Sequence, residues 1–81
     1  MTVNEARDLI ESILNRILAQ KGLERIRVHD DMRFLDSDIQ IDSIDLAVLL
    51  TGMEEATKKD PFKKGFRNFR TVGELARMYV E

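Results

Sequence analysis

The strongest constraint on the fold is the spacing of apolar residues near the start of the chain. They recur three or four positions apart, as on one face of a helix, at Val3, Ala6, Ile10, Ile13, Leu14 and Ile17, with Leu9 and Leu18 widening the stripe. Thr2 and Glu5 have the spacing of a capping box, and Gly22 supplies a C-terminal stop. The pattern predicts one helix over residues 3–20.

Two later segments carry the same kind of signal. Asp42 can cap a helix that begins at Asp42 or Ser43 and continues to about Thr57, and Asp45 lies in its first turn, where a carboxylate favours the helix dipole. A last helix follows Thr71 and Glu74, which repeat the capping-box spacing. Its apolar stripe consists of Val72, Leu75, Ala76 and Tyr79.

The segment between these two helices is less regular. Pro61 breaks the chain, and the spacing of Phe62, Phe66 and Phe69 allows one short helix or turn to place all three rings on the core side. Gly65 weakens such a helix. Residues 23–41 form a long first loop without a sustained period, in which Phe34, Leu35 and Ile39 are the candidate anchors.

These elements predict an all-α fold. We expect one domain over residues 1–81, built as a small four-helix bundle with three main helices, a short third helix and a long first loop. A chain of this size more often binds, carries or regulates than catalyses.

The composition excludes several classes of function. There is no cysteine, no apolar run long enough to span a bilayer, and no basic segment followed by an apolar core at the start. We therefore expect a cytoplasmic protein without disulfides. The lone His29 cannot build a metal site without carboxylates, and the aspartates lack the order of ligands in an EF-hand, so no metal site is predicted.

Charge is distributed unevenly along the chain. Residues 30–55 hold eight acidic side chains and one basic one, Arg33, while residues 58–70 hold six basic side chains and one acidic one, Asp60. The six are Lys58, Lys59, Lys63, Lys64, Arg67 and Arg70. The split predicts two electrostatically distinct surfaces.

The residues Asp42-Ser43-Ile44-Asp45 form a signature at the start of the second predicted helix. With the order of helices around it, this segment resembles the acyl and peptidyl carrier proteins, whose attachment motif is Asp-Ser-Leu at that place. Ser37 also follows an aspartate, but the residues after it are too few for a helix.

The resemblance implies a non-catalytic carrier. Ser43 would take a 4'-phosphopantetheine arm, with Asp42, Ile44 and Asp45 as the flanking motif, and the arm would hold an acyl group as a thioester. The implied partners are a phosphopantetheinyl transferase and the enzymes that load, transfer or condense the cargo, acting on a monomer. Gln40 replaces a glycine common in the family, and the segment after the second helix is basic instead of acidic. These departures favour a specialised lipid or polyketide pathway over housekeeping fatty acid biosynthesis.

A helical wheel of the second helix predicts the surface that partners meet. Leu46, Leu49, Leu50 and Met53 gather on one side, which we assign to the core. The opposite side is partly apolar and lies next to Ser43; it holds Ile44, Ala47, Val48, Thr51 and Glu55. Exposed apolar clusters often mark interaction sites. We assign this side, together with Lys63 and Lys64, to partner binding.

Other functions remain open from the residues alone. The chain could be an aminoacyl or peptidyl carrier, or a helical protein-interaction module that is never modified. Nucleic-acid binding through residues 58–70 is disfavoured, because the phenylalanines there are expected in the core and the basic side chains on a solvated face.

Overall fold

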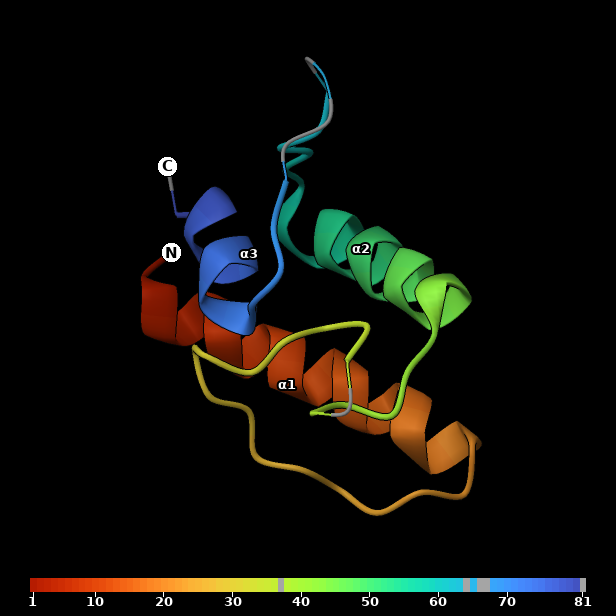
Figure 1. Cartoon of the computed structure of the whole chain (residues 1–81). Helices are drawn as coiled ribbons and strands as arrows, with labels where there is room; N and C mark the ends of the chain where they lie inside the picture. Colours follow the sequence, from red (N-terminus) through yellow and green to blue (C-terminus); the bar gives the residue numbers. More distant parts are fainter. Residues whose placement is uncertain (37, 64, 66–67, 81) are drawn as a thin grey trace.

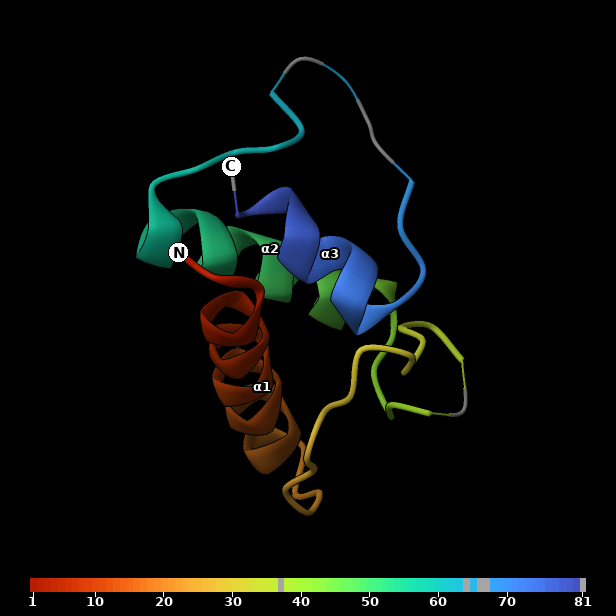
Figure 2. The same ribbon diagram turned by 90° about the vertical axis from the view of Figure 1, so that its left-hand side faces the viewer.

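The part of the chain that the structure describes folds into three α-helices joined by two long connections. The computed structural model describes residues 1–36, 38–63, 65 and 68–80. Within them the helices are α1 (Val3–Gln20), α2 (Ser43–Thr57) and α3 (Val72–Met78) (Figure 1). Both α2 and α3 pack against α1 and lie on the same side of it (Figure 2). The all-α class predicted from the sequence is confirmed.

Each helix begins at the predicted cap. The Thr2 hydroxyl accepts the Glu5 N–H at 3.1 Å and the Glu5 carboxylate accepts the Thr2 N–H at 2.8 Å. Capping boxes of the same type open α2 at Asp42 and α3 at Thr71. Each box satisfies backbone N–H groups that have no partner inside the helix.

The end of α1 is fixed by a Schellman motif. Gly22 has a φ of +76°, a left-handed conformation that costs a glycine little. Its N–H donates to the Ala19 carbonyl at 3.0 Å, and the Leu23 N–H donates to the Leu18 carbonyl at 2.8 Å. The stop predicted at Gly22 is therefore confirmed.

The core follows the predicted stripes. On α1 the apolar stripe is buried, with Val3 and Leu9 partly exposed at its edges. On α2, Leu49 and Met53 are fully buried, whereas Leu46 and Leu50 are half-buried. The core side of α2 is thus the one predicted. The buried apolar set is completed by Val28, Phe34, Ile39, Val72, Leu75, Ala76 and Tyr79.

The first loop is held against the helices by hydrogen bonds. Asn15 on α1 exchanges two of them with the backbone of Ile26, at 2.8 and 3.0 Å. We call residues 30–34 the strap, because they run along the start of α3. The Phe34 N–H donates to the Arg70 carbonyl, and the Val72 and Gly73 N–H groups donate to the carbonyls of Met32 and Asp30, each at 2.9 Å. One isolated antiparallel bridge joins Arg33 and Thr71.

One predicted anchor of this loop is wrong. Phe34 and Ile39 are buried as expected, but the Leu35 side chain is 57% exposed. Phe34 already fills the core position beneath the strap, and Leu35 follows it in a turn that is closed by a hydrogen bond from the Asp36 N–H to the Phe34 carbonyl.

The predicted short helix between α2 and α3 is absent from the described residues. A turn forms over residues 61–63, closed by a hydrogen bond from the Lys63 N–H to the Asp60 carbonyl at 3.2 Å. Gly65 follows with a φ of +137°, which no right-handed helix contains. Phe62 and Phe69 nevertheless pack against the core, with ring centroids 5.8 Å apart. Phe66 lies outside the described residues.

No helix in the described part of the chain combines the length and the apolar character needed to cross a membrane.

Candidate functional site

Ser43 is the first residue of α2, and its side chain is exposed. Asp42 precedes it as the N-cap: its carboxylate accepts the Asp45 N–H at 2.8 Å, while the Asp45 carboxylate accepts the Asp42 N–H at 3.2 Å. The carboxylate of each aspartate therefore accepts a hydrogen bond from the backbone of the other, and together they fix the first turn of α2. The Ser43 hydroxyl stands at a helix N-terminus, where backbone N–H groups and the helix dipole favour anions.

Lys21 joins this first turn to the end of α1. Its Nζ lies 2.6 Å from the Asp45 carboxylate and 3.3 Å from the Gln40 carbonyl. Gln40 precedes Ser43 in the chain and Asp45 follows it, so Lys21 contacts the segment on both sides of the serine. The hydrogen bond from Lys21, followed by that from the Asp42 backbone, lowers the pKa of Asp45. The same contact raises the pKa of Lys21.

Sequence reasoning missed this role of Lys21. The residue stands 24 positions before Asp45, and a lysine near the end of a helix is already explained by the helix dipole. No local signal links the two.

The outward side of α2 is exposed over its whole length. The Ile44 side chain is 73% exposed and Val48 is 52% exposed, and Ala47, Thr51 and Glu55 are also exposed. All five line one hollow of about 440 Å³, whose other wall is α1 with Ile13, Arg16, Ile17 and Gln20. We call it the α1–α2 groove. The structure thus brings together the five α2 residues assigned to partner binding.

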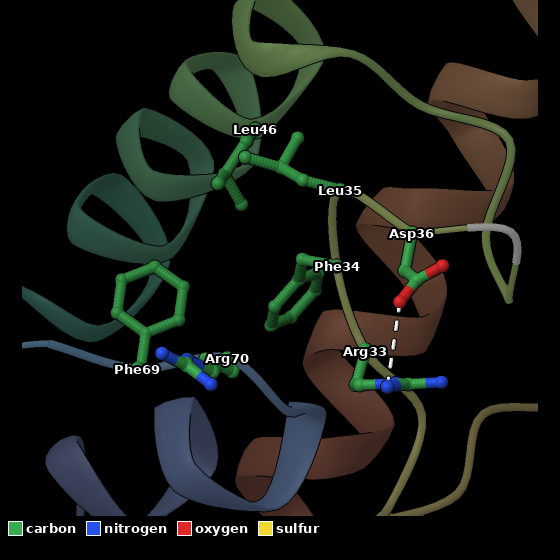
Figure 3. Close-up of a pocket in the computed structure, with 7 residues that line it drawn as sticks. All are labelled: Arg33, Phe34, Leu35, Asp36, Leu46, Phe69 and Arg70. Atoms are coloured by element: carbon green, nitrogen blue, oxygen red, sulfur yellow. Dashed lines mark ion pairs between the residues drawn. The ribbon is translucent and has the colours of Figure 1, made fainter.

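A second hollow lies on the other side of α2 (Figure 3). It measures about 230 Å³ and is lined by Arg33, Phe34, Leu35, Asp36, Leu46, Phe69 and Arg70. We call it the strap pocket, because the end of the strap and the two residues after it form one wall. Leu46 comes three positions after Ser43, so both lie on the same face of the helix. The sequence did not reveal this pocket, since its walls come from three separate segments.

The basic segment is less uniform than predicted. Lys58 and Lys63 are exposed, but they share their surface with Glu54, Glu55 and Asp60. The Lys59 ammonium donates to the carbonyl of Tyr79 at 3.2 Å and is half-buried. Among the described residues, the surface that was expected to be positive therefore carries both basic and acidic side chains. Lys64 and Arg67 lie outside them, as does Ser37.

Metal-binding chemistry finds no support in the described part of the chain. It contains no group of three or more histidine or acidic side chains arranged to hold an ion. His29 is exposed in the first loop.

Comparison with known proteins places this geometry in a family. No family model and no curated protein matches the chain. Among solved structures, it is similar to the solution structure of MacpD, an acyl carrier protein from Pseudomonas fluorescens involved in mupirocin biosynthesis. The match has a TM-score of 0.82 and 33% sequence identity, and covers 95% of this chain and 69% of MacpD. With this identity over nearly all of its length and the same helical fold, the chain belongs to the acyl carrier protein family.

Proposed function

We propose that this carrier holds an acyl group as a thioester on a 4'-phosphopantetheine arm attached to Ser43. The observation that carries the proposal is the position of Ser43, exposed and first in α2, directly after the N-cap Asp42. A transferase needs access to the hydroxyl, and the phosphodiester that it forms needs hydrogen-bond donors. An open helix N-terminus supplies both.

The residues around Ser43 fit such a group. Asp42 and Asp45 are engaged by the capping box, and Lys21 neutralises Asp45, so the carboxylates are held in place near the new phosphate. The arm, when attached, supplies the thiol that carries the cargo. The chain has no cysteine of its own, and its part in the chemistry is to present the arm.

The partners would be a phosphopantetheinyl transferase and the enzymes that load, transfer or condense the cargo. The exposed apolar side chains of Ile44 and Val48, beside Ser43, support docking along the outward side of α2. We infer a monomeric, cytoplasmic carrier. Lys63 would contribute to the recognition of partners from the far end of α2.

The pathway is proposed to be a specialised one. The similar protein MacpD is involved in mupirocin biosynthesis, and the basic residues after α2 differ from the acidic pattern usual in the family. Both favour a polyketide or unusual lipid pathway over housekeeping fatty acid biosynthesis. An aminoacyl or peptidyl cargo is the alternative within the same carrier chemistry.

The attachment is tested by intact mass after co-expression with phosphopantetheinyl transferases. Wild-type protein should gain the mass of one arm, and peptide mapping should locate it on Ser43. Ser43→Ala should stay folded and unmodified, because an exposed position at N1 contributes little to stability. Ser37→Ala is the matched control and should be modified like the wild type. Mapping of the arm to Ser37, or the absence of any arm with several transferases, would overturn the proposal.

A further inference from the structure

The backbone of Lys21 is held in one place by the end of α1. Lys21 follows the last residue of the helix, and its N–H donates to the carbonyls of Ile17 and Leu18 at 3.2 and 3.1 Å. Directly after it, the left-handed Gly22 closes the Schellman motif that ends the helix. The long side chain of Lys21 therefore starts from a point that its own helix fixes.

The ammonium group of Lys21 contacts the chain on both sides of Ser43. Its Nζ donates to Asp45 Oδ2 at 2.6 Å and to the Gln40 carbonyl at 3.3 Å. The same Oδ2 also accepts the Asp42 N–H at 3.2 Å. One ammonium group and one carboxylate oxygen therefore connect α1, the end of the first loop and the N-cap of α2.

The contact between Lys21 and Asp45 is partly sheltered from water. The Asp45 side chain is 19% exposed and that of Lys21 is 36% exposed. The hydrogen bond from Lys21 lowers the pKa of Asp45, so the carboxylate is ionised and the ion pair is intact at neutral pH. Ser43 itself is exposed. The residues on both sides of the serine are thus held, while the serine remains accessible.

The capping box of α2 does not by itself determine where Ser43 lies relative to the rest of the fold. It fixes the shape of the first turn, but both of its residues belong to that turn. Ile41 and Leu46 rest half-buried against the core on either side of the turn, and between them Lys21 supplies a polar contact from another element. The orientation of the Ser43 hydroxyl therefore depends on Lys21 as well as on the cap.

We propose that Lys21 is a positioning residue for attachment of the arm, because it holds the segments on both sides of Ser43. The inference rests on the proposed attachment at Ser43. Coenzyme A would donate the arm: Ser43 Oγ bonds to the phosphorus that carries the pantetheine, the bond from that phosphorus to adenosine bisphosphate breaks, and the serine proton leaves to solvent. A misplaced attacking oxygen slows such a step without weakening the encounter. Lys21 takes no part in the bond changes and acts through Asp45.

The test measures the kinetics of attachment to the unmodified protein. A purified transferase that modifies the wild type is supplied with coenzyme A, and intact mass follows the gain of one arm. The variants are Lys21→Gln and Lys21→Arg. The matched control is Arg25→Gln, because Arg25 is exposed and shares a hollow with residues 8–19 of α1. The control removes one positive charge close to Lys21 in the chain and leaves the contacts of Asp45 in place.

We expect Lys21→Gln to lower kcat about threefold, the range of a partly exposed ion pair, with KM nearly unchanged. Lys21→Arg should keep most of the wild-type rate, because a guanidinium also donates to a carboxylate, and Arg25→Gln should match the wild type. In an Asp45→Asn background, which should itself be slower, Lys21→Gln should cause little further loss, because the two side chains act as one unit. Circular dichroism confirms that every variant is folded at the assay temperature.

NMR provides a second readout that needs no transferase. In Lys21→Gln the pKa of Asp45 should rise toward its ordinary value. The Asp42 N–H, which donates to the same carboxylate oxygen, should exchange with solvent faster. Arg25→Gln should change neither. An Asp45 pKa that is the same in Lys21→Gln as in the wild type would show that the contact does not hold the turn in solution, and would overturn the inference.

Four kinetic results would also overturn it. Equal or faster attachment to Lys21→Gln would show that the serine needs no such support, and a loss carried by KM alone would make Lys21 a contact of the transferase. An equal loss in Arg25→Gln would reduce the effect to net charge, and an undiminished loss in the Asp45→Asn background would show that Lys21 does not act through Asp45. Failure of the proposed attachment is seen separately, because the wild type would then gain no arm.

Discussion

Replacement of Gly73 by alanine tests how tightly the strap is held against α3. Gly73 is the second residue of α3 and is buried, and its N–H donates to the Asp30 carbonyl at 2.9 Å. An added Cβ would lie 2.9 Å from Asp30 Cβ, 3.1 Å from its carbonyl oxygen and 3.3 Å from its Cα. Two of these atoms are backbone and the third is attached to it, so the strap itself has to move.

The magnitude follows from two opposing effects. Alanine is favoured over glycine inside a helix by about 1 kcal/mol. Overpacking against a fixed neighbour costs about 1–3 kcal/mol, and a weakened hydrogen bond to Asp30 adds about 1 kcal/mol. We expect Gly73→Ala to lower the free energy of unfolding by roughly 1–3 kcal/mol, which corresponds to a fall in Tm of about 4 °C or more in a domain of this size.

Gly52 provides the matched control. It is also a helical glycine, but its added Cβ would meet the end of a flexible side chain, Ile13 Cδ1, at 3.2 Å. We expect Gly52→Ala to change stability by no more than about 1 kcal/mol in either direction, because the gain in helix propensity offsets a small shift of Ile13.

Urea and thermal unfolding followed by circular dichroism measure both variants. NMR signals of Phe34, whose N–H binds the Arg70 carbonyl, report whether the strap has moved. The reasoning is refuted if Gly73→Ala is as stable as the wild type, or if Gly52→Ala is the more destabilised of the two.

Three further predictions concern the surface of the carrier and the first turn of α2. Val48→Lys should leave the melting temperature nearly unchanged but slow cargo transfer by partner enzymes, whereas Leu49→Ser should destabilise the fold by more than about 2 kcal/mol; unfolding of Val48→Lys would place Val48 in the core. The pKa of Asp45 is lowered in the folded state, first by Lys21, so its contribution to stability is present above pH 3.8 and is lost as the pH falls through the lowered pKa. Acid titration followed by circular dichroism should therefore show a smaller loss of stability between neutral and acidic pH for Asp45→Asn than for the wild type, and equal losses would argue against the contact. Lys63→Glu should slow transfer from the cognate partner more at low salt than at high salt, and rates unchanged at both salts would remove Lys63 from the partner surface.

The local features of this protein could be predicted from the sequence. The bounds of α1, the caps at Thr2, Asp42 and Thr71, and the stop at Gly22 all appear where the pattern indicated. Each depends on residues within four positions of one another, and so does the division of α2 into a buried and an exposed side. For the same reason the residues around Ser43 are enough to place it at the start of a helix.

Contacts between distant segments were decided by the tertiary structure alone. Lys21 reaches Asp45 because α1 and α2 pack together, and the strap pocket exists because residues 33–36, Leu46 and residues 69–70 meet. Leu35 is exposed because Phe34 beside it fills the core, and the expected short helix gives way to a turn that brings Phe62 and Phe69 to the core without helical geometry. Helix caps are satisfied by their neighbours in the chain, whereas a pocket or an ion pair across the fold depends on how whole elements pack, which no short stretch of sequence specifies.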